Sequence, residues 1–133
     1  MLYINKKYID QISEMAVASK SIEICGVISG INESAKEIYP IDNQAKSNTF
    51  FEFDTKQQFR IWRKMDEDGH EPLVIYHSHT QSRAYPSKDD VVYANEPYAH
   101  YLIISIDEKY KKEIRSYRII DGNVYEENIS IVN

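Results

Sequence analysis

The segment VIYHSHTQSRAYPSKDD, residues 74–90, brings two histidines close to a serine and several acids. Side chains two positions apart on a β-strand point to the same side of a sheet, so His77 and His79 are expected to project together. Paired imidazoles suit a first-row metal ion, zinc above all. The alternative is two hydrogen-bonded imidazoles in a polar cleft. The pair therefore predicts either a metal site or a polar cluster that resembles one.

Ser87 and Asp90 follow the histidines and have the pattern of a helix start. Their three-residue spacing places both on one face of the first helical turn. A catalytic zinc ion usually has three protein ligands and an open position for water, so Asp90 is the candidate third ligand. The same two residues fit a helix-capping box, although Glu or Gln is the commoner acid there. Spacing alone leaves both roles open.

Hydrolysis of an amide by an activated water also needs a group that moves a proton. Glu23 is a candidate because it begins the otherwise apolar run EICGVISG, and an acid at the edge of a buried element needs a partner. The simpler explanation is a solvent-exposed residue at the end of a strand. Composition does not identify which carboxylate moves the proton, since the chain has 21 acidic residues.

Length and composition are those of an ordinary globular protein, and we expect a single domain over residues 1–133. The net charge of −5 argues against a nucleic-acid partner, because no basic excess is present to displace counterions. No apolar run approaches the roughly 18 residues of a membrane span, and MLYINKKYID has no signal-peptide pattern. Cys25 is the single cysteine and cannot form an internal disulfide, so we expect a cytoplasmic protein.

Hydrophobic periodicity predicts helices interleaved with strands. Predicted helices cover residues 7–19, 55–66 and 87–95, and predicted strands cover residues 2–4, 22–30, 37–41, 48–54, 72–76, 101–106, 114–120 and 123–131. The second helix is expected to be capped by Asp54 and to bury Phe59, Trp62 and Met65. This order predicts a layered α/β domain with a mixed sheet, in which sites collect at the C-terminal ends of strands.

Taken together, these residues resemble the JAMM motif of the JAB/MPN metalloproteases. That motif is an early glutamate, then H-[ST]-H, seven residues, serine, two residues and aspartate. The resemblance implies that His77, His79 and Asp90 bind Zn²⁺, that Glu23 is the general base and acid, and that Ser87 stabilises the oxyanion. It also implies a three-layer α/β/α fold with a mixed sheet, similar to cytidine deaminases. Asp89 does not fit the spacing.

One departure from the common pattern is Thr80, where many family members have proline. The stretches IYHSHT, AYPS, NEPYAHYLIIS and RSYRIIDG are similar to a bacterial branch that releases cysteine from a sulfur carrier protein. The implied partner is a small ubiquitin-like carrier that ends in Gly-Gly and bears cysteine through an amide. The alternatives are a JAMM isopeptidase for another ubiquitin-like modifier and a non-catalytic MPN scaffold. A homodimer is one assembly state that we consider.

Other hydrolase chemistries fit the sequence less well. Cytidine deaminase would need P-C-x-x-C, which one cysteine excludes. A thermolysin-type H-E-x-x-H helix is absent. Cys25 as a nucleophile is the remaining alternative, but a cysteine inside an apolar run is expected to be core packing. His70 and His100 are expected to be structural or exposed.

Overall fold

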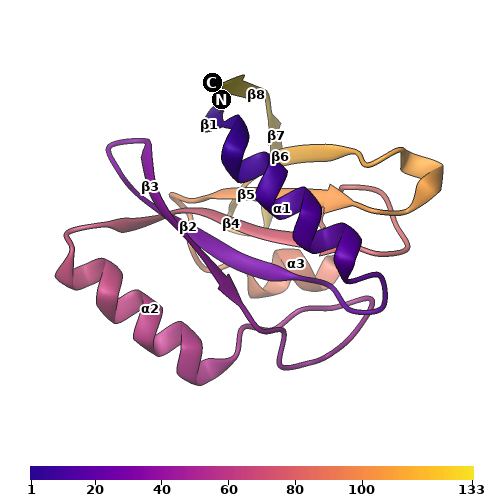
Figure 1. Cartoon of the computed structure of the whole chain (residues 1–133), viewed down its shortest axis with the longest axis horizontal. Helices are drawn as coiled ribbons and strands as arrows, with labels where there is room; N and C mark the ends of the chain where they lie inside the picture. The colour runs from indigo at the N-terminus through magenta and orange to yellow at the C-terminus, as the bar shows by residue number, and fades with distance from the viewer.

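The computed structural model describes all residues, 1–133, as strands alternating with three α-helices (Figure 1). The strands are β1 (Leu2–Asn5), β2 (Cys25–Ile31), β3 (Ser34–Ile41), β4 (Glu71–His79), β5 (His100–Ser105), β6 (Ile114–Ile120), β7 (Asn123–Glu127) and β8 (Ile129–Val132). The helices are α1 (Lys6–Ala18), α2 (Thr55–Glu67) and α3 (Lys88–Tyr93), with a short 3-10 turn at Glu108–Tyr110.

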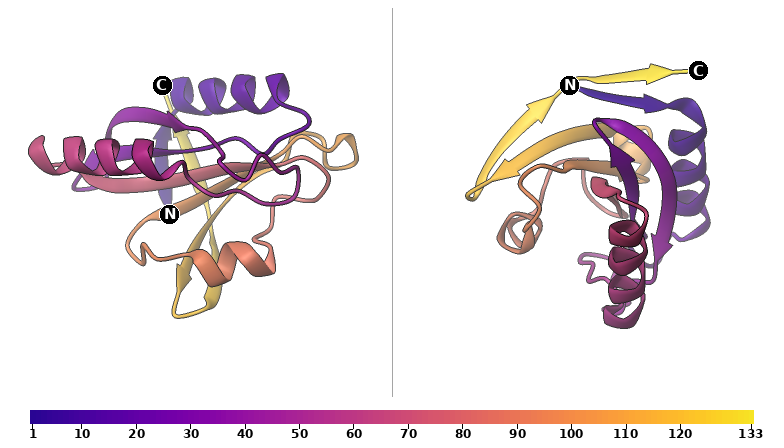
Figure 2. Two further views of the ribbon diagram at one scale, coloured as in Figure 1. Left: turned by 90° about the horizontal axis from the view of Figure 1, so that it is seen from below. Right: turned by 90° about the vertical axis from the view of Figure 1, so that its left-hand side faces the viewer.

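Six strands form one mixed sheet in the order β3-β2-β4-β5-β6-β7. Only β4 and β5 run parallel to each other, and the other neighbours are antiparallel. Strands β1 and β8 form a separate parallel pair, which brings the first and last strands of the chain together (Figure 2). The central position of β4 matters for the site, because this strand carries both histidines of the motif.

The sheet is covered on both faces. On one face α1 packs its Tyr8, Ile12 and Ala16 against a core that includes Val74 and Tyr76 of β4. On the opposite face Ile75 belongs to a second core, to which α2 and α3 contribute (Figure 2). Alternate residues of β4 thus face different layers, as the pleat of a strand requires. The predicted three-layer α/β/α arrangement with a mixed sheet is confirmed.

Side-chain caps start the two longer helices. Asn5 accepts a hydrogen bond from Lys7 N at 2.9 Å at the start of α1, and Asp54 accepts one from Gln57 N at 2.9 Å at the start of α2. Such caps satisfy backbone N–H groups that have no partner within the helix. The predicted cap at Asp54 is confirmed. No helix in the structure combines the length and the apolar character needed to cross a bilayer.

The predicted strand at residues 48–54 is wrong. These residues form an irregular loop whose one ladder contact is an isolated bridge between Asn43 and Phe53. The Asn43 side chain accepts a hydrogen bond from Glu52 N at 3.0 Å and donates one to Phe50 O at 2.9 Å. A side chain therefore takes the place of the neighbouring strand that the apolar pattern led us to expect.

The exposure of one side chain and the bounds of several elements also differ from the prediction. Phe59 is 67% exposed, because the inward stripe of α2 passes through Ile61 and Met65 instead. Strand β2 begins at Cys25, so Glu23 precedes the strand rather than lying within it. Strand β4 extends to His79, so both histidines lie within the strand rather than beyond its end. Helix α3 ends at Tyr93, slightly earlier than expected.

Candidate metal centre

His77 and His79 project from β4 toward the same side, as the two-residue spacing predicts. Their Nε2 atoms lie 3.1 Å apart, and both side chains are almost fully buried. Ser78 faces the other way and accepts a hydrogen bond from Ile24 N at 2.9 Å, which fastens this part of β4 to the residues that lead into β2. The histidine pair is therefore presented by the middle of the sheet and not by a free loop.

Asp90 completes a triangle with the two imidazoles. Its Oδ2 atom lies 3.1 Å from the Nε2 atom of each histidine. Burial works against the charged form, but the facing His77 and the hydrogen bonds from both rings and from Ser87 N hold the pKa of Asp90 well below its usual range. The carboxyl group is therefore an anion, which is the state that binds a metal ion.

Asp90 and Ser87 also form a capping box at the start of α3. Ser87 Oγ accepts a hydrogen bond from Asp90 N at 3.1 Å, and Asp90 Oδ2 accepts one from Ser87 N at 2.8 Å. The two roles that the sequence left open for this pair are thus combined in one carboxylate. Its position is fixed by the first turn of the helix while its oxygen faces the histidines.

Glu23 lies beside the same cluster, although it is remote in sequence. One oxygen or nitrogen atom from each of Glu23, His77 and His79 lies within 4.8 Å of the others. Glu23 is 3% exposed and its Oε1 atom has no hydrogen-bond partner. Burial raises the pKa of Glu23 to about 8, while His79 opposes this increase and Asp90 adds to it. The interpretation of Glu23 as a solvent-exposed strand end is therefore wrong.

The donor set fits a zinc ion. Nitrogen ligands about 2.0–2.1 Å from a tetrahedral zinc ion lie about 3.3 Å from one another, close to the 3.1 Å separations of the triangle. Burial lowers the pKa of His77, which favours the neutral ring that can act as a ligand. His79 donates from Nδ1 to Arg83 O at 2.7 Å, which orients the ring with its Nε2 atom toward the cluster.

Two sets of three possible metal ligands contain His77 and His79. The third member is Glu23 in one set and Asp90 in the other. Asp90 Oδ2 lies within hydrogen-bonding distance of the Nε2 atoms of both histidines. Glu23 belongs to the same cluster, but its Oε1 atom has no hydrogen-bond partner. Asp90 is a buried anion, and Glu23 has a pKa near neutrality. The geometry therefore favours Asp90 as the third ligand and leaves Glu23 as the group that can gain and lose a proton.

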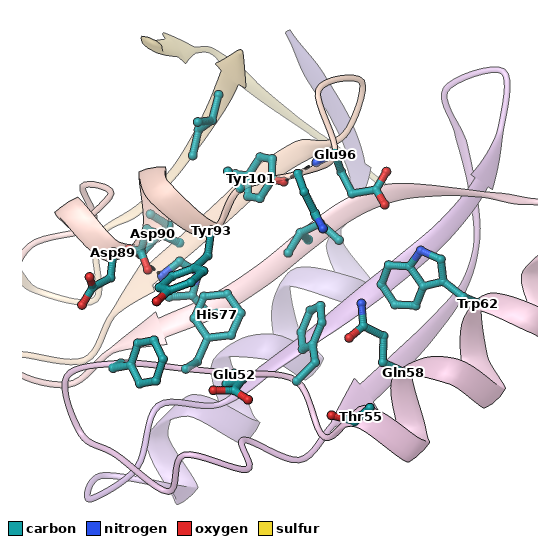
Figure 3. A pocket seen from close by; sticks show the side chains of 18 residues that line it. Glu52, Thr55, Gln58, Trp62, His77, Asp89, Asp90, Tyr93, Glu96 and Tyr101 are labelled. Carbon is teal, nitrogen blue, oxygen red and sulfur yellow. Dashed lines mark hydrogen bonds and ion pairs between the residues drawn. The ribbon is translucent and has the colours of Figure 1, made fainter. Parts of the chain in front are cut away.

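A cleft of about 410 Å³ opens beside His77 (Figure 3). Tyr93 and Asp90 approach it from α3, and Trp62 approaches it from α2. Phe51 stacks on the His77 ring at a centroid distance of 4.4 Å and an interplanar angle of 26°. Sequence reasoning missed Phe51 as a residue that lines the cleft, for which the run FFEF was the available signal. His77 and Asp90 of the candidate metal centre thus line this cleft.

Cys25, His70 and His100 are not among the residues of this cluster. Burial raises the pKa of the Cys25 thiol far above its usual range, which disfavours the thiolate that a nucleophile requires. His100 is fully buried and lies 2.6 Å from Glu127 and 2.7 Å from Glu33. His70 contacts Ser29 at 3.3 Å. The structural role expected for these two histidines agrees with these contacts.

Comparison with known proteins gives one consistent family. Residues 5–120 match the family described as prokaryotic homologs of the JAB domain. The CysO-cysteine peptidase of Mycobacterium tuberculosis is 44% identical over 112 residues, which cover 83% of this chain and 77% of that protein. The desampylase of Haloferax volcanii is 30% identical over 97 residues, which cover 71% of this chain and 70% of that protein.

The fold comparison agrees with the sequence comparison. A JAB1/MPN domain protein from Archaeoglobus fulgidus matches with a TM-score of 0.63 at 15% identity, over 100% of this chain and 98% of that chain. Similarity at this level of identity bears on the fold alone. The family match covers most of the chain, and the motif residues lie together in the structure. The chain therefore belongs to the JAB/MPN family, as a prokaryotic homologue of the JAB domain, and is a JAMM-type peptidase.

Proposed function

We propose that this chain is a zinc-dependent hydrolase that cleaves the amide between the C-terminal glycine of a ubiquitin-like sulfur carrier protein and cysteine. The observation that carries the proposal is the meeting of two Nε2 atoms and one carboxylate oxygen at 3.1 Å, beside a buried carboxyl group. The 44% identity with a CysO-cysteine peptidase supports the choice of substrate. Released cysteine would complete a carrier-dependent route to this amino acid.

His77, His79 and Asp90 are the residues that would hold the ion. The chemistry that zinc supplies when bound is acidification of a water molecule and polarisation of a carbonyl group. The protein's own contribution is to fix the three donors on two rigid elements, β4 and the first turn of α3. Burial of all three side chains keeps bulk water away from this chemistry.

Glu23 is the proton carrier in this proposal. It takes the proton from the attacking water and returns it to the amine nitrogen of the departing cysteine. A pKa of about 8 in the protein alone means that both protonation states are accessible near neutral pH. Its Oε1 atom has no partner in the structure and is therefore free to contact the water. A carboxylate that already ligated the ion would not be available for this transfer.

Ser87 is the donor to the developing oxyanion. Its Oγ atom accepts a hydrogen bond from Asp90 N, but its hydroxyl hydrogen is not used in any hydrogen bond of the structure. The capping interaction therefore holds the oxygen in place and leaves the hydrogen available for the scissile carbonyl. Fixed donors of this kind stabilise charge that appears only in the transition state.

The test combines metal analysis with a defined substrate. The purified wild-type protein and Glu23→Gln are expected to contain zinc in equal amounts, and Asp90→Ala is expected to have lost it. Wild type is expected to release cysteine from a carrier that ends in Gly-Gly-cysteine, and Glu23→Gln is expected to be inactive. Absence of bound zinc from wild type would refute the mechanism. Loss of zinc in Glu23→Gln would show that Glu23 is a ligand and not the base.

A second candidate is a JAMM isopeptidase that acts on another ubiquitin-like modifier. It is favoured by the 30% identity with a desampylase and would use the same five residues. Parallel incubation with a Gly-Gly isopeptide and with the cysteine-bearing carrier separates the two. Cleavage of the isopeptide without release of cysteine would favour the second candidate. A non-catalytic scaffold is the weakest alternative, because such members typically lack the ligands that this chain retains.

A further inference from the structure

The segment between β3 and α2, residues 42–54, contains no helix or extended strand, and the side chain of Asn43 makes several of the hydrogen bonds within it. Asn43 is 9% exposed, and its Oδ1 atom accepts hydrogen bonds from Ala45 N and Glu52 N, both at 3.0 Å. Its Nδ2 atom donates to Phe50 O at 2.9 Å. The oxygen and the nitrogen of the side-chain amide therefore both form hydrogen bonds within the segment. We call residues 42–54 the Asn43 segment.

The Asn43 segment also holds the backbone of Glu23. Glu23 N donates to Ser47 O at 2.9 Å, and Asn43 Nδ2 donates to Glu23 O at 3.1 Å. Because Glu23 precedes β2, the ladder of the sheet does not fix these two backbone groups. Both of the backbone hydrogen bonds of the proposed proton carrier thus end in the Asn43 segment.

A second attachment joins the segment to the histidine motif. The Thr80 hydroxyl, one residue beyond His79, donates to Asn48 O at 2.5 Å. Thr80 is 9% exposed, so this contact lies inside the protein. The Thr80 hydroxyl therefore ties the segment to the residue that follows the end of β4.

We propose that Asn43 and Thr80 are positioning residues for the reaction: they fasten the Asn43 segment against Glu23 and so fix its carboxylate relative to His77 and His79. The inference rests on the proposed role of Glu23 as proton carrier. A misplacement of about 1 Å in a catalytic group can lower a rate by about 10²-fold. Loosening of the Glu23 backbone is therefore expected to reduce kcat, while the ligands on β4 and α3 remain in place.

A different role for the segment predicts a different kinetic change. Phe51 stacks on His77, and Phe50, Phe51 and Phe53 line the cleft. If the segment served only as a wall of the cleft, its disturbance would raise KM and leave kcat unchanged. If it positions Glu23, kcat falls and KM changes little. The two roles are thus separated by which kinetic constant responds.

The test compares variants that remove one part of each contact. Asn43→Ala removes every hydrogen bond of the side chain, whereas Asn43→Asp keeps the acceptor oxygen and removes the donor to Glu23 O and Phe50 O. Both are expected to lower kcat about 10- to 100-fold with KM and zinc content near wild type.

Thr80→Val removes the hydroxyl at nearly constant shape and is expected to lower kcat, and Thr80→Ser is expected to restore it. Asn5→Ala, which removes the cap of α1 on the opposite face, is the control for general loss of stability and is expected to keep wild-type kcat.

Amide hydrogen exchange at Glu23 gives a measurement that does not depend on turnover. The Glu23 N–H is expected to exchange at least about tenfold faster in Asn43→Ala than in wild type and Asn5→Ala, because its acceptor Ser47 O lies in the loosened segment. Unchanged exchange, or a change in KM alone, would overturn the inference. If wild type released no cysteine, the proposed function would fail, and the exchange rates would still decide whether Asn43 holds Glu23.

Discussion

Removal of the Glu23 carboxyl group should change how the stability of the metal-free protein depends on pH. The pKa of Glu23 is about 8 in the folded protein, against an ordinary value of 4.5. Between these values the folded state holds a proton that the unfolded chain releases. The free energy of unfolding must therefore fall as pH rises through this window, because the folded state binds more protons. Below pH 4.5 both states are protonated and the effect disappears.

The size of the effect follows from the same two values. At pH 7 the unfolded carboxyl group lies 2.5 units above its pKa of 4.5, while the folded group is still mostly protonated. Each unit corresponds to about 1.4 kcal/mol, so the expected loss of stability at pH 7 is about 3 kcal/mol. Total stabilities of about 5–15 kcal/mol are usual, so the loss is measurable. Glu23→Gln keeps the shape of the side chain and removes its titration.

The assay is urea unfolding in the presence of a chelator, followed by fluorescence of Trp62, the single tryptophan. The difference in unfolding free energy between Glu23→Gln and wild type is expected to rise from a constant value near pH 4 by about 3 kcal/mol at pH 7. Groups that do not interact with Glu23 cancel in this difference. Glu14→Gln, at an exposed position of α1, is the matched control and should follow wild type. A difference that is the same at all pH values would refute the reasoning.

Three further predictions concern single side chains. Ser87→Ala should lower turnover by about 10²-fold through the lost oxyanion donor and reduce the free energy of unfolding by about 1 kcal/mol through the lost cap. Loss of zinc in this variant would instead show that Ser87 acts through Asp90. Gly26→Ala should destabilise by more than about 2 kcal/mol, because the added Cβ would collide with the Tyr76 ring and lie 2.6 Å from Tyr39 O; thermal unfolding near the wild-type temperature would contradict this. Tyr76→Phe should stabilise by about 1 kcal/mol, because it removes a buried hydroxyl without a partner; a lower stability in urea would reveal a partner for that hydroxyl.

Features governed by local rules could be predicted from the sequence. The spacing of His77 and His79 fixes their common direction once they lie on a strand, and the pattern at Ser87 fixes the start of α3. The buried side chains of α1 follow from helical periodicity. In each of these cases the determinants lie within a few residues of one another, which is the range over which periodicity and capping act.

Features that depend on distant parts of the chain could not be predicted in this way. The burial of Glu23 beside the histidines results from the antiparallel pairing of β2 with β4, which places Cys25 opposite His77. Sequence spacing contains no information on that pairing, and only the family resemblance selected Glu23. The wrong strand at residues 48–54 has a similar origin, since its apolar pattern was correct for a buried segment but its hydrogen-bond partner is the side chain of Asn43.

The capping box at the start of α3 has a consequence for how such sites can be found in other sequences. Glu or Gln is the usual residue at position N3 of a capping box, since a long side chain reaches back easily to the N-cap. Here the shorter Asp90 makes the same contact and turns its oxygen toward two imidazoles. A Ser-x-x-Asp cap that follows a strand with alternate histidines is therefore a searchable pattern with a physical basis. It marks a helix whose first turn holds a carboxylate in place for two histidines on a neighbouring strand.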